Sequence, residues 1–322
     1  MSADATTREA MAPIVPVALV MPLRNEAHAM EDFFLAYRRF TVLPREIMFV
    51  DTGSTDGTRD LVAAWCAANR GDGVNACLLD LPGGLPGAGR NHGVAMSTAP
   101  WIAFLDAGIR PESDWLQQLV ACAEREGADA VLGACRFGSE HPVGLAVCAL
   151  TNGAGRIRPV LPASLFARGV FDRAGGFAPG LRAGEDVLWL AGVRARCGAP
   201  AQCRAARVHY GRYPETLAAA FLKWMRYERS MVGTPVGRRK RAALFITVAF
   251  GLAGAAFSAA AVPALLAGYA VLRGGLDPIR RSRDVAWWRN RPSAVFLAPL
   301  VALALDTGSA VGTLAGWARR GR

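Results

Sequence analysis

Strand-like and helix-like segments alternate along residues 15–134, and this pattern restricts the fold more than any other feature. Five apolar runs are predicted as strands, and a helix with apolar residues at helical spacing follows each of the first four. The predicted strands are 15–21, 46–50, 76–79, 101–105 and 130–134, and the predicted helices are 27–39, 58–69, 87–96 and 114–126. This alternation is typical of right-handed β-α-β units. We expect an α/β domain with a mostly parallel sheet.

Two of these strands end in a carboxylate. Asp51 and Asp106 come directly after predicted strands, and the carboxyl ends of parallel strands line the ligand crevice of such a sheet. The Gly/Ser/Thr turn at 52–57 fits two interpretations. It is a β–α turn with Thr55 or Asp56 as the helix N-cap, or it offers backbone N–H groups to a polar ligand.

The last 85 residues have a different composition. From Arg238 onward there are 13 Arg/Lys and 3 Asp, so this part carries +10 of the net charge of +11. Uncharged, mostly apolar residues fill 242–272, and 293–317 is apolar apart from Asp306. Each stretch exceeds the roughly 20 residues of a spanning helix. We therefore predict a catalytic domain over 14–232 and a membrane-associated helical region over 238–322.

The charge pattern bears on orientation and partners. The segment between the apolar stretches, 273–291, is basic, and it lies outside if the first stretch crosses the membrane once. If the chain turns back near Pro263, both basic segments stay cytoplasmic, and this interpretation is favoured. The basic excess then indicates anionic lipid at the inner membrane rather than nucleic acid. Seven cysteines without a C-x-x-C pair agree with a reducing, cytoplasmic location of the domain.

Four motifs in order add chemistry to this framework. They are Met21-Pro22-Leu23-Arg24-Asn25-Glu26, Gly89-Arg90-Asn91-His92-Gly93, Asp106-Ala107-Gly108, and Gly175-Gly176-Phe177 with Gly184-Glu185-Asp186. Together with the turn after Asp51, the set resembles the family 2 glycosyltransferases over residues 15–227. The resemblance implies the GT-A nucleotide-sugar fold. It also implies transfer of a sugar from a nucleoside diphosphate donor with inversion of the anomeric centre.

The resemblance assigns donor-binding roles to six positions. Pro22, Arg24 and Glu26 match the loop that lines the nucleoside pocket, and Asp51 matches the carboxylate that hydrogen-bonds the base. Arg90 matches a basic residue near the donor phosphates or the neighbouring acidic strand end. Asp106 matches the first carboxylate of the Asp-x-Asp signature.

Two adjacent carboxylates are candidates for the catalytic base. Asp186 matches the residue that deprotonates the acceptor hydroxyl in this family. Its predicted position at the start of a helix over 185–197 stabilises the ionised form that a base needs. Glu185 is the alternative base, or a group that caps the helix and holds the acceptor.

The metal signature is incomplete, because Gly108 stands where the family usually has a second Asp. Mg²⁺ or Mn²⁺ bound to Asp106 alone, plus phosphate and water oxygens, is held less tightly. His209 is a candidate second ligand, and Arg90 or Arg110 could replace the missing charge. Metal dependence is therefore doubtful from the sequence.

We expect a membrane-anchored glycosyltransferase with a lipid-linked or membrane-proximal acceptor. A nucleotidyltransferase is one alternative, although it normally needs a stronger metal site. A catalytically silent scaffold is another, favoured by Gly108 and disfavoured by the Glu185-Asp186 pair. The predicted helix over 214–231 is amphipathic and lies against the domain or at the membrane surface. We expect its Lys223, Arg226 and Arg229 either to form a solvated helix face or to contact the membrane.

Overall fold

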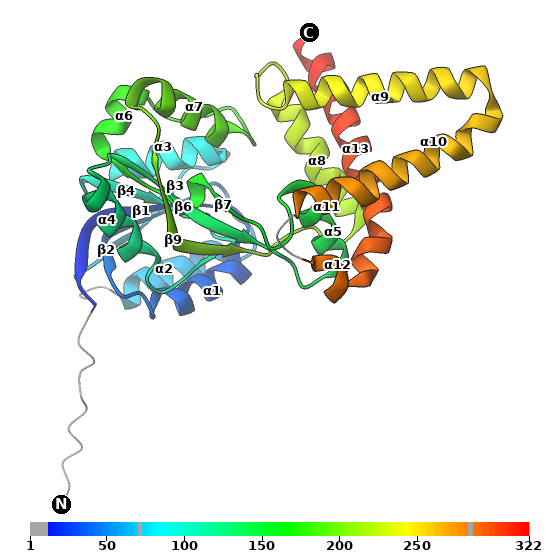
Figure 1. Ribbon diagram of the computed structural model, residues 1–322. Coiled ribbons are helices and arrows are strands. Elements are labelled where there is room, and N and C mark those ends of the chain that lie inside the picture. Colours follow the sequence, from blue (N-terminus) through cyan, green and yellow to red (C-terminus); the bar gives the residue numbers. More distant parts are fainter. Residues whose placement is uncertain (1–11, 70–72, 283–285, 322) are drawn as a thin grey trace, which may run out of the picture.

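A nine-stranded sheet with helices on both faces forms one end of the molecule, and a group of helices forms the other (Figure 1). The computed structural model describes residues 12–69, 73–282 and 286–321. The strands are β1 (Ile14–Leu23), β2 (Leu43–Asp51), β3 (Asn75–Asp80), β4 (Trp101–Phe104), β5 (Ile109–Pro111), β6 (Ala130–Phe137), β7 (Ile157–Pro159), β8 (Leu165–Ala167) and β9 (Ala201–Tyr210). The helices around the sheet are α1 (Ala27–Tyr37), α2 (Thr58–Ala68), α3 (Pro86–Met96), α4 (Trp115–Glu126), α6 (Arg168–Ala174) and α7 (Glu185–Cys197), with a 3₁₀ turn η1 (Leu161–Ala163).

The strand order is β3-β2-β1-β4-β8-β6-β9-β5, with β7 beside β6. The first four strands in this order are parallel, as the sequence predicts, and β6 pairs with β9 in parallel. Strands β8, β5 and β7 pair only antiparallel, which makes the sheet mixed. The sequence did not predict these three strands, because three residues are too few to show a period of two.

Strand β1 shows how the sheet separates two cores. Val17, Leu19 and Met21 belong to the core beneath α1, α2 and α4, whereas Ala18 and Val20 belong to the core beneath α3, α6 and α7. All five are fully buried. Since successive side chains of a strand point to opposite faces, a continuous apolar run is what a strand covered on both sides requires.

Several predicted segments differ from the structure by a few residues at their ends. The helix predicted over 27–39 ends at Tyr37, and the one predicted over 214–231 begins at Leu217. Thr216 sets that start, because its side chain accepts a hydrogen bond from the Ala219 N–H at 3.1 Å.

The other end of the molecule is helical. Its elements are α5 (Pro142–Thr151), α8 (Leu217–Met231), α9 (Arg238–Phe257), η2 (Ala259–Ala261), α10 (Val262–Tyr269), the π-helical η3 (Ala270–Leu276), α11 (Asp277–Arg281), α12 (Trp287–Asn290) and α13 (Pro292–Arg320). Between α9 and α10 the chain reverses at 258–261, beside Pro263 (Figure 1). The apolar stretch 242–272 is therefore not one helix. Within the described residues, α13 alone is long and apolar enough to span a membrane.

Helix α13 packs closely on α8 through three glycines. A Cβ at Gly308, Gly312 or Gly316 would lie 2.5 Å, 2.3 Å and 2.6 Å from Phe221 O, Met225 O and Val232 Cγ2, respectively. Only glycine lets the two helix backbones approach this far. Helices α8 and α5 belong to the predicted domain 14–232, but they pack with α13. The predicted boundary after residue 232 therefore does not coincide with a spatial boundary between two domains.

Asp306 lies on α13 and is fully partnered. Arg273 binds both of its carboxylate oxygens, at 2.7 and 2.9 Å, and the Tyr269 hydroxyl donates to one of them at 2.9 Å. Asp306 is therefore a paired charge inside the helical region.

Candidate active site

A buried arginine joins three elements at the carboxyl ends of the strands. Arg90 on α3 binds Glu185 Oε1 at 2.7 Å and Asp106 Oδ1 at 2.8 Å. Arg90 and Glu185 are 3% and 5% exposed, whereas the Asp106 side chain is 41% exposed. The arginine thus links the end of β4 to the start of α7, and the sequence prediction of an acidic strand end beside Arg90 agrees with this geometry.

Two glycines of α3 allow this approach. A Cβ at Gly89 would lie 2.9 Å from Pro22 Cβ, and one at Gly87 would lie 2.6 Å from Ala178 O. Helix α3 therefore lies against the end of β1 on one side and the segment before α7 on the other. Larger residues here would separate Arg90 from its carboxylates.

Asn91 and Phe177 hold the segment before α7, and the sequence analysis gave neither a role. The Asn91 side chain donates to Phe177 O and accepts from Phe177 N, both at 2.8 Å. The Phe177 ring lies 5.5 Å from the Arg90 guanidinium and stacks on Trp189 of α7 at 4.4 Å. The cation–π contact and the stacking orient α7 relative to Arg90. The adjacent Arg90 and Asn91 in the Gly89–Gly93 motif were the sequence signal that could have indicated this contact.

The two candidate bases have different surroundings. Glu185 is held by Arg90, and burial raises its pKa, with Arg90 acting in the opposite direction. Asp186 is half-buried in the first turn of α7, and its Oδ1 accepts from the Val187 N–H at 2.8 Å. Within the described residues, no cation pairs with Asp186. This geometry leaves Asp186 free to accept a proton and makes Glu185 a partner of Arg90.

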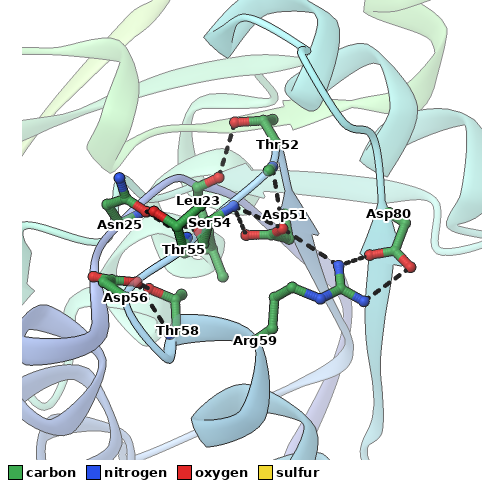
Figure 2. A network of polar contacts seen from close by, with 11 residues as sticks. Leu23, Asn25, Asp51, Thr52, Ser54, Thr55, Asp56, Thr58, Arg59 and Asp80 are labelled. Carbon is green, nitrogen blue, oxygen red and sulfur yellow. Dashed lines mark hydrogen bonds and ion pairs between the residues drawn. The ribbon is translucent and has the colours of Figure 1, made fainter.

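Asp51 organises the loops at the ends of β1 and β2 (Figure 2). It is 1% exposed, and its carboxylate accepts from the N–H groups of Gly53 and Ser54 at 3.1 Å each. Arg59 of α2 reaches Asp51 at 3.3 Å and also binds Asp80 at the end of β3. The predicted contact between Asp51 and a nucleobase stays a prediction. In the structure, this carboxylate accepts hydrogen bonds from the backbone of the turn.

The loop after β1 is bound to the same turn. Asn25, at φ 57°, accepts from the Thr55 N–H at 2.8 Å, and its own N–H donates to Ser54 Oγ at 2.9 Å. The structure places Pro22 at the end of strand β1 rather than in the loop; Pro22 and Glu26 are half-buried, and Arg24 is exposed. Burial raises the pKa of Glu26, whereas the nearby Arg212 lowers it. The predicted nucleoside loop is therefore rigid at its base.

Among the described residues, the side chains around Asp106 do not by themselves supply a full set of ligands for a divalent cation. A Cβ at Gly108 would lie 3.2 Å from Arg212 Cδ, so a flexible arginine stem lies next to the position of the missing carboxylate. One oxygen of Asp106 is already bound to Arg90. Within the described residues, no cluster of three His, Cys, Asp or Glu side chains is placed to hold a metal ion.

The side chain of His209 does not face Asp106. It contacts Glu112 at 3.0 Å, whereas its neighbour Tyr210 on β9 is the residue beside Gly108, with Cε2 3.9 Å from the position of a Cβ there. Since adjacent residues of a strand point to opposite faces, His209 points away from Asp106. The proposed ligand pair of Asp106 and His209 therefore has no support in the geometry.

Two cations without a predicted role in the site, Arg212 and Lys223, lie near Glu26, whose pKa Asp106 also influences. Arg212 follows β9 and binds Asp32 of α1 at 2.9 Å. Lys223 of α8 is half-buried and donates to the Tyr210 hydroxyl at 3.3 Å. Burial and the Asp106 carboxylate raise the pKa of Tyr227, also on α8, to about 12, so its hydroxyl is neutral at pH 7. From the sequence, Lys223 and Tyr227 were predicted only to lie on the amphipathic helix over 214–231.

The sequence is similar to a family model and to several known proteins. Residues 18–183, about half of the chain, match the model of glycosyl transferase family 2. The chain is 31% identical over 124 residues to glycosyltransferase AglE of Haloferax volcanii, covering 38% of this chain and 40% of that protein. It is 29% identical over 219 residues to the pre-mycofactocin glycosyltransferase of Mycobacterium tuberculosis, covering 60% and 44%. The chain thus spans less than half the length of the curated relatives it matches.

A solved structure supports the fold. The mannosyltransferase PcManGT of Pyrobaculum calidifontis, in complex with GDP-Man and Mn²⁺, superimposes with a TM-score of 0.51 at 18% identity and covers 94% of this chain and 86% of that one. Its sheet-and-helix arrangement is the one predicted from the four motifs. This chain belongs to glycosyl transferase family 2 and has the GT-A fold.

Proposed function

We propose that this chain is an inverting glycosyltransferase. It moves a sugar from a nucleoside diphosphate donor to a lipid-linked or membrane-proximal acceptor at the cytoplasmic face of the inner membrane. The observation that carries the proposal is that the two carboxylates at the start of α7 differ in their ion pairing. Arg90 binds Glu185 and Asp106, while the adjacent Asp186 remains unpaired within the described residues.

The transfer is a single displacement. The acceptor oxygen attacks the anomeric carbon, the bond from that carbon to the diphosphate oxygen breaks, and the nucleoside diphosphate leaves with the electron pair. Asp186 accepts the proton of the acceptor hydroxyl. This carboxylate lies in the first turn of α7, at the positive end of the helix dipole. Negative charge grows on the leaving diphosphate, so a fixed cation beside it lowers the barrier.

We assign that cation to Arg212, with Lys223 as a second contributor, and propose that transfer does not need Mg²⁺ or Mn²⁺. The support is the Arg212 stem beside Gly108 and the influence of both cations on Glu26. A guanidinium stays charged at any physiological pH and can bind two phosphate oxygens at once.

The membrane part of the proposal depends on exposed apolar surface. Phe296 of α13 is 82% exposed and Phe250 of α9 is 75% exposed, and the opposite face of α13 is buried on α8. Exposed apolar faces of this extent mark a membrane or protein contact. The basic residues at the start of α9 favour anionic lipid beside it.

Product analysis tests the reaction class. We expect the full chain in detergent micelles to release a nucleoside diphosphate from one member of a panel of uridine and guanosine diphosphate sugars, when a membrane lipid extract supplies acceptors. Release of pyrophosphate would indicate a nucleotidyltransferase. Donor binding without turnover of any panel member would indicate a silent scaffold.

Calorimetry with UDP and GDP tests the cation assignment. We expect equal affinity in EDTA and in Mn²⁺, and a loss of about tenfold to a hundredfold in Arg212→Met. Arg207→Met, an exposed arginine on β9, is the matched control and should have no effect. Binding that requires Mn²⁺ in the wild-type chain would overturn the assignment.

The Gly108→Asp variant gives a second test. Gly108 is not among the glycines with positive φ, and the Arg212 stem near its position is flexible, so the fold should accept the change. The new carboxylate should pair with Arg212 and weaken nucleotide binding in EDTA. Mn²⁺ should then restore binding, which it should not do in the wild-type chain.

A further inference from the structure

A basic cavity lies between the loop after β1, the segment before α7, helix α8 and the end of α13, and it has no role in the function proposed above. It has a volume of about 770 Å³, within the range of small-molecule sites. Six arginines line it together with neutral residues, and no acidic residue contributes. The arginines are Arg24, Arg182, Arg226, Arg229, Arg319 and Arg320.

These arginines come from four segments that are distant in sequence. The loop after β1, the segment before α7, helix α8 and the end of α13 each contribute at least one. Arg226 and Arg229 are three residues apart on α8, so they share one helix face. Within the described residues, none of the six pairs with a carboxylate. Like charges gathered in this way repel each other unless an anion neutralises them.

The segment that leads into α7 forms part of the cavity wall. The Arg182 N–H donates to Ser230 Oγ at 2.6 Å, which joins the segment before α7 to α8 at the cavity wall. Asp186 follows only four residues after Arg182. On the other wall, Arg24 and Asn25 belong to the loop whose base is bound to the turn after Asp51.

We infer that this cavity binds the acceptor through a phosphate or diphosphate group, with the accepting hydroxyl directed toward Asp186. The inference rests on the proposed glycosyltransferase function and specifies its acceptor class. Guanidinium groups bind phosphate oxygens in pairs and remain charged, which makes arginine the suited residue for this anion. Arg319 and Arg320 end the apolar helix α13, so a phosphate carried by a lipid is within reach of the same cavity.

Inorganic pyrophosphate is the probe for the anion site. Calorimetry of the full chain in micelles should show binding that Arg226→Gln/Arg229→Gln weakens by at least tenfold, consistent with the loss of charge-assisted hydrogen bonds. Arg204→Gln/Arg207→Gln removes the same charge from exposed positions on β9 and should leave pyrophosphate affinity unchanged. Circular dichroism of both variants checks that each is folded.

UDP and GDP separate the acceptor site from the donor site. Their affinity should change less than twofold in Arg226→Gln/Arg229→Gln. If nucleotide affinity falls by the same factor as pyrophosphate affinity, the cavity belongs to the donor and the inference is wrong. Equal pyrophosphate affinity in both double variants and the wild-type chain would also overturn it. If pyrophosphate binds through the arginines but neither UDP nor GDP binds, the transferase function fails while the anion site stands.

Vesicles distinguish the source of the phosphate. Vesicles of phosphatidylcholine with 10% phosphatidic acid should compete with pyrophosphate more strongly than pure phosphatidylcholine vesicles if the phosphate is on a lipid. This difference should disappear in Arg226→Gln/Arg229→Gln. Competition by soluble glycerol 3-phosphate but not by the vesicles would support a soluble phosphate ester as the acceptor instead.

Discussion

The Arg90→Met variant tests the buried charge cluster most directly. The change keeps an apolar stem and removes the guanidinium that neutralises Glu185, which is 5% exposed. Asp106 also loses a partner, but its side chain is 41% exposed, so water compensates for most of that loss. The cost should therefore come chiefly from Glu185.

Protonation limits the size of that cost. An unpaired buried Glu185 need not stay ionised, because it can take up a proton. From its ordinary pKa of 4.5 to pH 7 this costs about 1.36 kcal/mol per pH unit, or about 3.4 kcal/mol in total. At pH 5 the same limit is about 0.7 kcal/mol. We expect Arg90→Met to lower the free energy of unfolding by about 3 kcal/mol at pH 7 and by less than about 1 kcal/mol at pH 5.

Urea denaturation in micelles, followed by fluorescence, measures both values. Trp189 is buried and stacks on Phe177 beside Arg90, so it reports on this region. Adding Glu185→Gln to Arg90→Met should recover stability at pH 7, because it removes the unpaired carboxylate. A loss that is equal at both pH values, or one that Glu185→Gln does not relieve, would refute the reasoning.

Three further predictions concern the base, the helix contact and pH. Asp186→Asn should lower kcat on the order of 100-fold to 10,000-fold with donor affinity unchanged by calorimetry; full activity would move the base elsewhere. Gly312→Val should lower Tm, since its Cβ would lie 2.3 Å from Met225 O, whereas Gly251→Val on α9, with nothing within 4 Å, should not; equal melting temperatures would contradict the close helix contact. Because burial raises the pKa of Glu26, the folded state holds this proton more tightly, and stability should fall as pH rises from 4.5 through the folded pKa. Glu26→Gln should reduce that slope in Tm measured from pH 4 to 8, and an unchanged slope would count against a buried Glu26.

The sequence alone determined the α/β class and much of the site. Apolar runs and helical spacing are local, so the five predicted strands and the start and end of α7 could be read without a structure. Asp51 and Asp106 were placed at strand ends by the same local pattern. The ordered motifs identified Arg90, Glu185 and Asp186, although not that Arg90 would hold Glu185 and leave Asp186 unpaired.

Tertiary structure alone decided which charges meet. Arg212 lies beside Gly108 because β5 and β9 pair antiparallel, and a strand of three residues leaves no periodic signal. The same pairing directs His209 away from Asp106. The arginine cavity needs α8 and α13 in contact, which depends on glycines of α13 meeting the α8 backbone. Each of these contacts joins segments far apart in the chain, and local propensity does not encode which distant surfaces fit together.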